Sequence, residues 1–264
     1  MMPKWPTTER VAPESWALRV TYWQSLAAYR WASDHVRGKR VLDVGCGDGY
    51  GTAELAARAR YAVGLDDDGN VLREARRRYG APRLAWVRAR ADRLPFRDES
   101  LDVVCCFQVL EHLREPERFL AEARRVLVPE GILLMTTPNR SAVLAGLNPH
   151  HVREYDAEGL RRLCSPFFQD VELLGVFPSE RVARYRAANR RLVERLLRWD
   201  RFGLVRRLPV ELRASLHAIG TLAVRRWVNA RQRRLVEAIG VDDFTIGPGD
   251  LARAIDLVVV ATRR

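Results

Sequence analysis

The chain has 264 residues, of which 47% are apolar, and it carries a formal net charge of +12. This length suits one large domain or a domain with an insertion, and the apolar content is that of an ordinary globular protein. No apolar run reaches the roughly 18 residues that a transmembrane helix needs, and residues 1–6 lack the apolar core of a signal peptide. We therefore expect a cytoplasmic protein.

Residues 15–37 carry apolar and aromatic side chains at helical spacing, which predicts one or two N-terminal helices. Strands and helices then alternate, and the strands are almost continuously apolar. Both features are typical of parallel βαβ units with helices on both faces of the sheet. The predicted strands are 41–45, 62–66, 84–88, 102–107, 131–137 and 168–175, and the predicted helices are 50–60, 69–79, 116–127 and 156–164.

The pattern changes after Phe177, and from Ser179 to Trp199 apolar residues recur at helical spacing with arginine on the other side. A Gly-Pro-Gly sequence ends this region, and residues 255–261 are predicted to form a final strand. The predicted segments are N-terminal helices at 1–37, a domain of residues 38–178 and 250–264, and an arginine-rich helical insertion or lid at 179–249.

Glycines stand at four alternate positions, 45, 47, 49 and 51, between the first predicted strand and its helix. Glycine tolerates positive φ and has no Cβ, so the backbone can turn sharply and approach a ligand closely. The helix that follows presents unpaired N–H groups to that ligand. Asp66 ends the next strand, where a carboxylate can accept both hydroxyls of a ribose. These features indicate a cofactor that contains adenosine.

The spacing of the glycines separates two classes of cofactor. Enzymes that use a dinucleotide carry G-x-G-x-x-G, whereas this chain has G-x-G-x-G-x-G with Asp43 two residues before the first glycine. The run resembles motif I of the class I S-adenosylmethionine-dependent methyltransferases. The resemblance covers roughly residues 38–175 and 255–262. It implies a Rossmann-like, seven-stranded, mostly parallel sheet whose last strand is antiparallel.

The resemblance also assigns residues to the cofactor, S-adenosyl-L-methionine. In the family this loop holds the amino-acid end of the cofactor, and Asp43 would support the loop indirectly. Asp66 would bind the ribose, with Asp67 beside it, although Asp67 and Asp68 also suit solvated or helix-capping roles. The loop residues assigned to the cofactor are Gly45, Cys46, Gly47 and Gly49.

Two later segments extend the resemblance. Residues 94–96, Leu-Pro-Phe, match the end of the family's G-D-A-x-x-L-P-F loop, which caps the adenine. The acid of that motif aligns with Arg90, so Asp92 or the backbone N–H of Ala91 would take its place. Residues 107–113, which include Gln108, match the loop after the fourth strand, and that loop lies alongside the cofactor.

Residues 137–139 and 148–155 resemble a loop of the methyltransferase type 11 branch that modifies ubiquinone and glycans. Those enzymes commonly methylate oxygen, and a hydroxyl acceptor has to lose a proton, for which histidine is suited. His151 aligns with the loop histidine of the branch and is the first candidate base, with Glu154 to orient its ring. The alternative for His151 is that it caps a helix or fills a lid. His112 is the second candidate, and its alternative is packing or loop hydrogen bonding beside the cofactor. A metal ion on His150, His151 and Glu154 would lack a further ligand, so we expect none.

Arginine supplies 43 of the 45 basic residues and is concentrated in one segment. Residues 176–240 contain 16 arginines against five acids, a net charge of +11, which leaves +1 for the rest of the chain. Three interpretations stay open: a helical lid, a docking surface for an anionic acceptor at a membrane face with Trp199 and Trp227 as anchors, or a nucleic-acid surface. The segment has no known nucleic-acid module, which disfavours the third.

The sequence thus predicts an S-adenosylmethionine-dependent methyltransferase that acts on an oxygen of a small molecule, a sugar or a lipid-linked glycan. An RNA methyltransferase is one alternative. A protein that binds the cofactor without catalysis is another, and only Arg90 points to it. A nicotinamide-dependent oxidoreductase is disfavoured by the glycine spacing.

Overall fold

The structure is a computed structural model of the whole chain, and it describes residues 14–142, 151–199 and 210–264. The chain divides into two compact units. The first consists of Met1–Gln24, Leu144–His151 and Pro178–Phe244, and the second of Ser25–Val143, Val152–Phe177 and Thr245–Arg264. The domain boundaries expected from the sequence stay a prediction.

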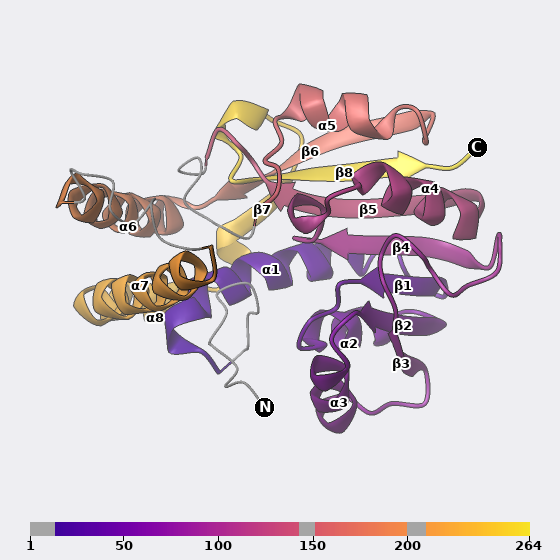
Figure 1. Cartoon of the computed structure of the whole chain (residues 1–264), viewed down its shortest axis with the longest axis horizontal. Coiled ribbons are helices and arrows are strands. Elements are labelled where there is room, and N and C mark those ends of the chain that lie inside the picture. Colours follow the sequence, from indigo (N-terminus) through magenta and orange to yellow (C-terminus); the bar gives the residue numbers. More distant parts are fainter. Residues whose placement is uncertain (1–13, 143–150, 200–209) are drawn as a thin grey trace. The chain divides into compact units, whose positions relative to one another are not determined.

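An eight-stranded sheet organises the fold, in the order β3-β2-β1-β4-β5-β8-β6-β7 (Figure 1). Strands β3, β2, β1, β4 and β5 pair in parallel, whereas β8 runs antiparallel to both β5 and β6. The mostly parallel sheet with an antiparallel last strand is therefore confirmed. The strands are β1 (Arg40–Val44), β2 (Tyr61–Asp66), β3 (Leu84–Arg88), β4 (Leu101–Phe107), β5 (Leu127–Pro138), β6 (Asp170–Pro178), β7 (Phe244–Gly247) and β8 (Asp256–Thr262).

The predicted number of seven strands is wrong by one. Strand β7 lies at the edge of the sheet beside β6, within the stretch predicted to be helical. It has only four residues, which is too few to show a clear alternation of apolar and polar side chains. By contrast, the strands and helices predicted between residues 41 and 175 all have counterparts, and their ends differ by at most four residues.

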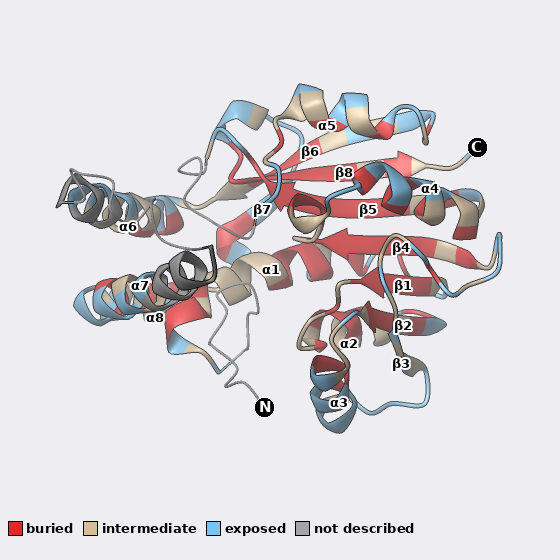
Figure 2. Ribbon diagram, in the orientation of Figure 1, coloured by how far each residue is buried: buried red, intermediate tan, exposed pale blue. Residues whose placement is uncertain are grey.

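Helices cover both faces of the sheet, as the continuously apolar strands predict. Phe119 of α4 lies in one buried cluster with Leu133 of β5, and α5 contributes to the same cluster. Tyr29 of α1 lies in another cluster with Leu134, because successive side chains of a strand point to opposite faces. Figure 2 shows the central strands almost entirely buried. The helices are α1 (Arg19–Ala32), α2 (Tyr50–Ala56), α3 (Gly69–Arg78), α4 (Pro116–Val126) and α5 (Ala157–Cys164).

The first compact unit contains α6 (Glu180–Trp199), α7 (Val210–Arg231) and α8 (Arg233–Ala238). The Tyr185 hydroxyl of α6 donates a hydrogen bond to Asn229 Oδ1 of α7 at 2.9 Å. Asn229 Nδ2 in turn donates to the carbonyl oxygen of Trp16 at 2.6 Å. None of the helices in the described part of the chain is both long and apolar enough to cross a bilayer.

The packing of the sheet can be tested at Leu134, which is fully buried. Leu134→Ala should lower the free energy of unfolding by about 2–5 kcal/mol, because the truncation leaves a cavity between the sheet and its helices. Tyr61→Ala is the control, since Tyr61 is 53% exposed, and its effect should stay within about 0.5 kcal/mol. Urea unfolding measures both values. Similar small losses in the two variants would contradict this description of the core.

Candidate functional site

The candidate site lies where the direction of the sheet order reverses. Strand β1 leads into α2 on one face of the sheet, and β4 leads through a short 3-10 helix, η2 (Leu110–His112), into α4 on the other face. In open α/β sheets such a switch point forms a crevice at the carboxyl ends of the strands. Here the loops after β1 and β4 meet closely, because a Cβ on Gly45 would lie 2.3 Å from Cγ2 of Val109.

The glycine loop makes a sharp turn at this switch point. Gly45 and Gly47 have φ angles of 74° and 50°, in the left-handed region that disfavours larger residues. A Cβ added to Gly47 would meet no atom within 4 Å, so bare backbone borders open space there. Gly49 packs instead against the ring of Trp86, and Cys46 is buried. Of the predicted loop residues, Gly47 is therefore the one whose backbone is best placed to face a ligand.

Asp66 ties this loop to the end of β2. Its Oδ2 accepts a hydrogen bond from the backbone N–H of Gly47 at 3.1 Å, and its Oδ1 accepts from the N–H of Asp68 at 2.9 Å. The carbonyl oxygen of Leu65 accepts from the N–H groups of Gly45 and Cys46 at 2.7 and 3.0 Å. The structure thus brings together the glycine loop and Asp66, which the sequence placed on neighbouring strands.

The acids beside Asp66 have different environments. Asp68 caps α3, since its Oδ1 accepts from the N–H of Asn70 at 2.8 Å. Asp67 is exposed, and its carbonyl oxygen accepts from Nε of Arg88 at 2.9 Å. A role of Asp67 in binding the cofactor stays a prediction.

Asp43 is fully buried on β1. It accepts a hydrogen bond from Thr52 Oγ1 of α2 at 2.6 Å and from the Tyr29 hydroxyl of α1 at 3.2 Å. Burial raises the pKa of its carboxyl group to about 7, although these hydrogen bonds act in the opposite direction. Asp43 therefore joins two helices to the strand that carries the glycine loop, which agrees with an indirect role.

Arg90 and Asp92 form a bidentate ion pair. Arg90 Nε and Nη2 donate to Asp92 Oδ1 and Oδ2 at 2.8 and 2.6 Å, and this pairing lowers the pKa of Asp92. Ala91 lies between them, in a tight turn closed by a bridge between Arg90 and Arg93. The arginine at the acid position of the motif therefore carries its own counter-charge two residues away.

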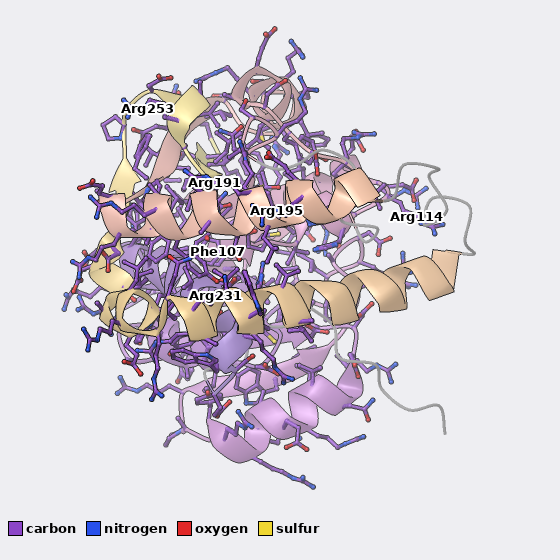
Figure 3. All side chains as sticks on the ribbon, turned by 90° about the vertical axis from the view of Figure 1, so that its left-hand side faces the viewer. Phe107, Arg114, Arg191, Arg195, Arg231 and Arg253 are labelled. Atoms are coloured by element: carbon purple, nitrogen blue, oxygen red, sulfur yellow. The ribbon has the colours of Figure 1, made fainter. Side chains whose placement is uncertain are left out.

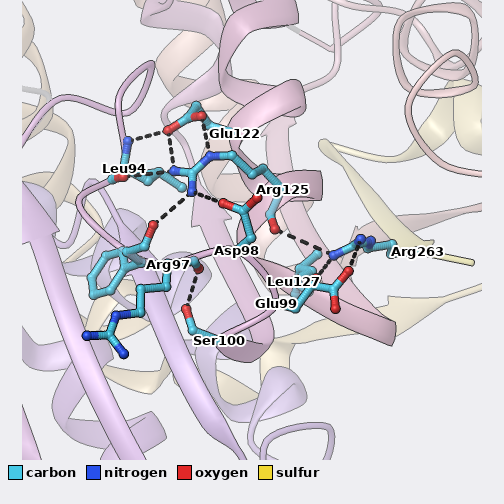
Figure 4. Close-up of polar contacts among 10 residues, drawn as sticks. Leu94, Arg97, Asp98, Glu99, Ser100, Glu122, Arg125, Leu127 and Arg263 are labelled. Atoms are coloured by element: carbon cyan, nitrogen blue, oxygen red, sulfur yellow. Dashed lines mark hydrogen bonds and ion pairs between the residues drawn. The ribbon is translucent and has the colours of Figure 1, made fainter.

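Arg125 of α4 anchors the Leu-Pro-Phe segment that follows (Figure 4). Its guanidinium group donates to the carbonyl oxygens of Leu94 and Phe96 at 2.9 and 2.8 Å. The same group pairs with Glu122 at 2.7 Å, and Glu122 accepts from the N–H of Leu94 at 2.7 Å. This network raises the pKa of Arg125 and fixes the loop that the resemblance assigns to the adenine.

The loop after β4 begins with a strained residue. Gln108 has a φ angle of 57°, which is uncommon for a residue other than glycine and often marks a functional site. Its backbone N–H donates to the carbonyl oxygen of Thr136 at 2.9 Å, and its Nε2 donates to Thr136 Oγ1 at 3.2 Å. The side chain is half-buried at the carboxyl end of β4, where a cofactor contact is predicted.

Glu111 is a candidate that the sequence analysis missed. Only 1% of its surface is exposed, it accepts from Thr137 Oγ1 at 3.0 Å, and burial raises the pKa of its carboxyl group to about 7. His112 Nε2 lies 4.0 Å from Glu111 Oε1. The signal in the sequence was an acid next to a histidine in an otherwise apolar segment directly after a strand.

The other catalytic candidates, His151 and Glu154, have different surroundings. His151 is half-buried in the first compact unit, whereas His112 and Glu154 belong to the second. Glu154 lines a groove of about 670 Å³ with Arg140 and Asp156, and burial raises the pKa of its carboxyl group. The orientation of the His151 ring by Glu154 stays a prediction. Residue 150, the other histidine of this segment, lies outside the described residues.

The buried acids predict a pH dependence of stability. Asp43 keeps its proton up to about pH 7 in the folded protein but only up to about pH 4 when unfolded, so stability falls as pH rises through that window. Asp43→Asn should reduce this slope by about one proton, or about 1.4 kcal/mol per pH unit. Urea unfolding between about pH 5 and pH 7 measures the slope. Asp34→Asn, at an exposed carboxylate, is the control. If the dependence of stability on pH were equally steep in the unaltered protein, Asp43→Asn and Asp34→Asn, the raised pKa of Asp43 would be contradicted.

Comparison with known proteins agrees with this geometry. Residues 42–135 match a family described as methyltransferase domain. A probable S-adenosylmethionine-dependent methyltransferase of Mycobacterium tuberculosis is 35% identical over 181 residues, which are 67% of this chain and 65% of that relative. The chain thus spans slightly less than two thirds of the length of this relative. A fatty-acid O-methyltransferase of Mycolicibacterium smegmatis is 39% identical over 107 residues, 40% of this chain and 39% of the relative.

The fold is shared with a solved S-adenosylmethionine-dependent methyltransferase of Thermotoga maritima. The two structures align with a TM-score of 0.59 over 94% of this chain and 91% of the other, at 16% sequence identity. At this identity the likeness concerns the fold alone. Together with the family match, it supports the expectation raised by the glycine loop. The chain therefore contains a methyltransferase domain of the class I, S-adenosylmethionine-dependent family.

Proposed function

We propose that the protein transfers a methyl group from S-adenosyl-L-methionine to an oxygen atom of a small molecule, a sugar or a lipid-linked glycan. The observation that carries this proposal is the glycine loop at the switch point, with Gly47 facing open space and held by Asp66. The family match and the relatives named above support the reaction class.

The chemistry of the loop fits this cofactor. The segment from Gly45 to Gly49 contains Asp48 but no lysine or arginine, and Asp66 adds a second carboxylate nearby. Such a site disfavours a pyrophosphate and favours a ligand with cationic sulfonium and ammonium groups. Gly47 leaves room for the ligand beside the backbone. Asp66, at the end of β2, would accept the ribose hydroxyls.

The protein's own residues would mainly align the acceptor and exclude water. The cofactor, when bound, supplies a methyl group already activated on sulfur. Catalysis then depends on orientation in a water-poor crevice. Gln108, at the end of β4, borders that crevice, and the segment anchored by Arg125 would close it over the adenine.

A hydroxyl acceptor also needs a group that takes its proton. We assign this role first to His151 and second to His112. The buried carboxyl group of Glu111, 4.0 Å from His112 Nε2, would stabilise the protonated ring once it has accepted the proton. Glu154 would act on His151 in the same way.

Two observations support an oxygen acceptor. Residues 137–139 and 148–155 resemble a loop of enzymes that methylate oxygen, although residues 148–150 lie outside the described part. The relative from Mycolicibacterium smegmatis is named for O-methylation of a fatty acid. An apolar or lipid-linked acceptor is consistent with both.

The cofactor assignment can be tested with Asp66→Ala. Loss of the carboxylate should weaken binding of S-adenosylmethionine by roughly 1–3 kcal/mol, the scale of a hydrogen bond to a charged group. Isothermal titration calorimetry measures the affinity, with NAD as a competing ligand that should not bind. Asp34→Ala serves as the control, because Asp34 is exposed and pairs only with Arg58 among the described residues. Unchanged affinity in Asp66→Ala would show that the ribose assignment is wrong.

The proposed base can be tested by transfer of a labelled methyl group to hydroxylated acceptors from a cell extract. His151→Ala should lower kcat by roughly 10²–10⁴-fold without changing cofactor affinity, since only the proton transfer is lost. His112→Ala tests the second candidate in the same assay. His35→Ala, at a histidine three residues after α1, is the matched control. Full turnover in both His151→Ala and His112→Ala would remove histidine as the base.

A further inference from the structure

The first compact unit has a core of apolar side chains, and the arginines that the structure describes in it are not among the buried residues. Val182 and Tyr185 of α6 and Val228 of α7 are buried, and the bond between Tyr185 and Asn229 fixes the two helices together. Two groups of exposed arginines in this unit differ in whether an acid pairs with them.

One group of arginines is neutralised by acids of the same unit. Arg181 pairs with Asp243 at 3.3 Å, and Arg233 pairs with Glu237 at 2.8 Å. Arg184 likewise pairs with Glu180, one helical turn away, at 2.5 Å. These pairs give three arginines a counter-charge within the same unit.

A second group is exposed and faces one side. Arg191 and Arg195 lie one turn apart on α6, and Arg231 lies on the neighbouring helix α7, on the same side of the unit (Figure 3). Within the described residues, Arg191 and Arg195 have no hydrogen bond or ion pair to a protein group. Arg231 lies over the ring of Trp227, with 4.2 Å between its guanidinium carbon and the ring centroid.

Trp227 is unusual for an apolar residue because 45% of its surface is exposed. Its indole contributes an apolar ring with a polar N–H group, a combination that favours the boundary between water and lipid. The guanidinium group of Arg231 covers one face of that ring, which limits stacking of a nucleic-acid base on it. The guanidinium groups of Arg191, Arg195 and Arg231 are suited to phosphate oxygens, and each can bind a phosphate with two hydrogen bonds.

We propose that Arg191, Arg195, Trp227 and Arg231 form a docking face for a bilayer that contains anionic phospholipids. The arginines bind lipid phosphates, and Trp227 enters the headgroup region. Charge complementarity supports this partner, because residues 176–240 carry a net charge of +11 while the rest of the chain is nearly neutral. The docking face is independent of the proposed methyl transfer, but it would bring the protein to lipid-linked acceptors. The side chain of residue 199, the other expected anchor, lies outside the described residues.

Co-sedimentation of the full chain with vesicles tests the proposal. The protein should bind vesicles that contain phosphatidylglycerol, should not bind vesicles of phosphatidylcholine alone, and should be released by salt. The variant R191Q/R195Q/R231Q should bind the anionic vesicles roughly a hundredfold more weakly, because each basic residue near such a surface contributes about a fivefold change in affinity.

The matched control is R83Q/R97Q/R253Q, which removes the same charge from exposed arginines of the second unit. It should retain binding, since its arginines lie outside the docking face. Thermal unfolding checks that both triple variants are folded. If R191Q/R195Q/R231Q is unstable, the single variant W227A tests the docking face in the same co-sedimentation assay, and it should also weaken binding.

Three outcomes would overturn the proposal. The first is no binding of the unaltered protein to anionic vesicles. The second is an equal loss of binding in the control and test variants, which would indicate a response to net charge alone. The third is binding of an RNA oligonucleotide without binding to vesicles, which would identify the face as a nucleic-acid surface.

Discussion

The hydrogen bond between the Gly47 N–H and Asp66 Oδ2 joins the two elements on which the candidate site depends. The parallel pairing of β1 and β2 makes this hydrogen bond possible. The pairing aligns Val44 with Leu65 and so brings both strand ends to the same edge of the sheet. The carbonyl oxygen of Leu65 then receives the first N–H groups of the glycine loop. A larger residue at Gly45 would strike Val109, so the loop after β4 limits the turn from the other side. Sheet topology and local backbone geometry thus bring the glycine loop, Asp66 and the loop after β4 together at one edge of the sheet.

Two buried carboxyl groups lie close to this edge, and burying their charged forms lowers the stability of the folded protein. Asp43 and Glu111 are both almost inaccessible to water, and burial raises the pKa of each to about 7. Their main partners are hydroxyl groups, from Thr52 for Asp43 and from Thr137 for Glu111. A hydroxyl can donate to either the charged or the neutral acid, so it reduces the desolvation penalty without removing it. Groups that titrate near neutral pH in a crevice are candidates for function, which is why Glu111 enters the proposed mechanism.

Much of the fold could be predicted from the sequence, because local signals and global topology agree. Glycines that follow an apolar strand and precede a helix define the β1–α2 turn without any tertiary information. The capping role of Asp68 is local as well. Two features were not predicted from the sequence. The ion pair of Arg90 with Asp92 follows from a tight turn, and the burial of Glu111 follows from the contact of η2 with β5. Strand β7 escaped detection because its four residues exist as a strand only through pairing at the sheet edge.

The fold by itself does not determine the reaction, since one α/β scaffold serves many chemistries. The proposed reaction therefore depends on which ligand binds at Gly47 and Asp66. The most direct measurement is a crystal structure of the chain with S-adenosylmethionine. The account predicts that the ribose hydroxyls contact the Asp66 carboxylate and that the amino-acid end of the cofactor lies along Gly47. A cofactor bound elsewhere, with both residues remote from it, would contradict the central claim.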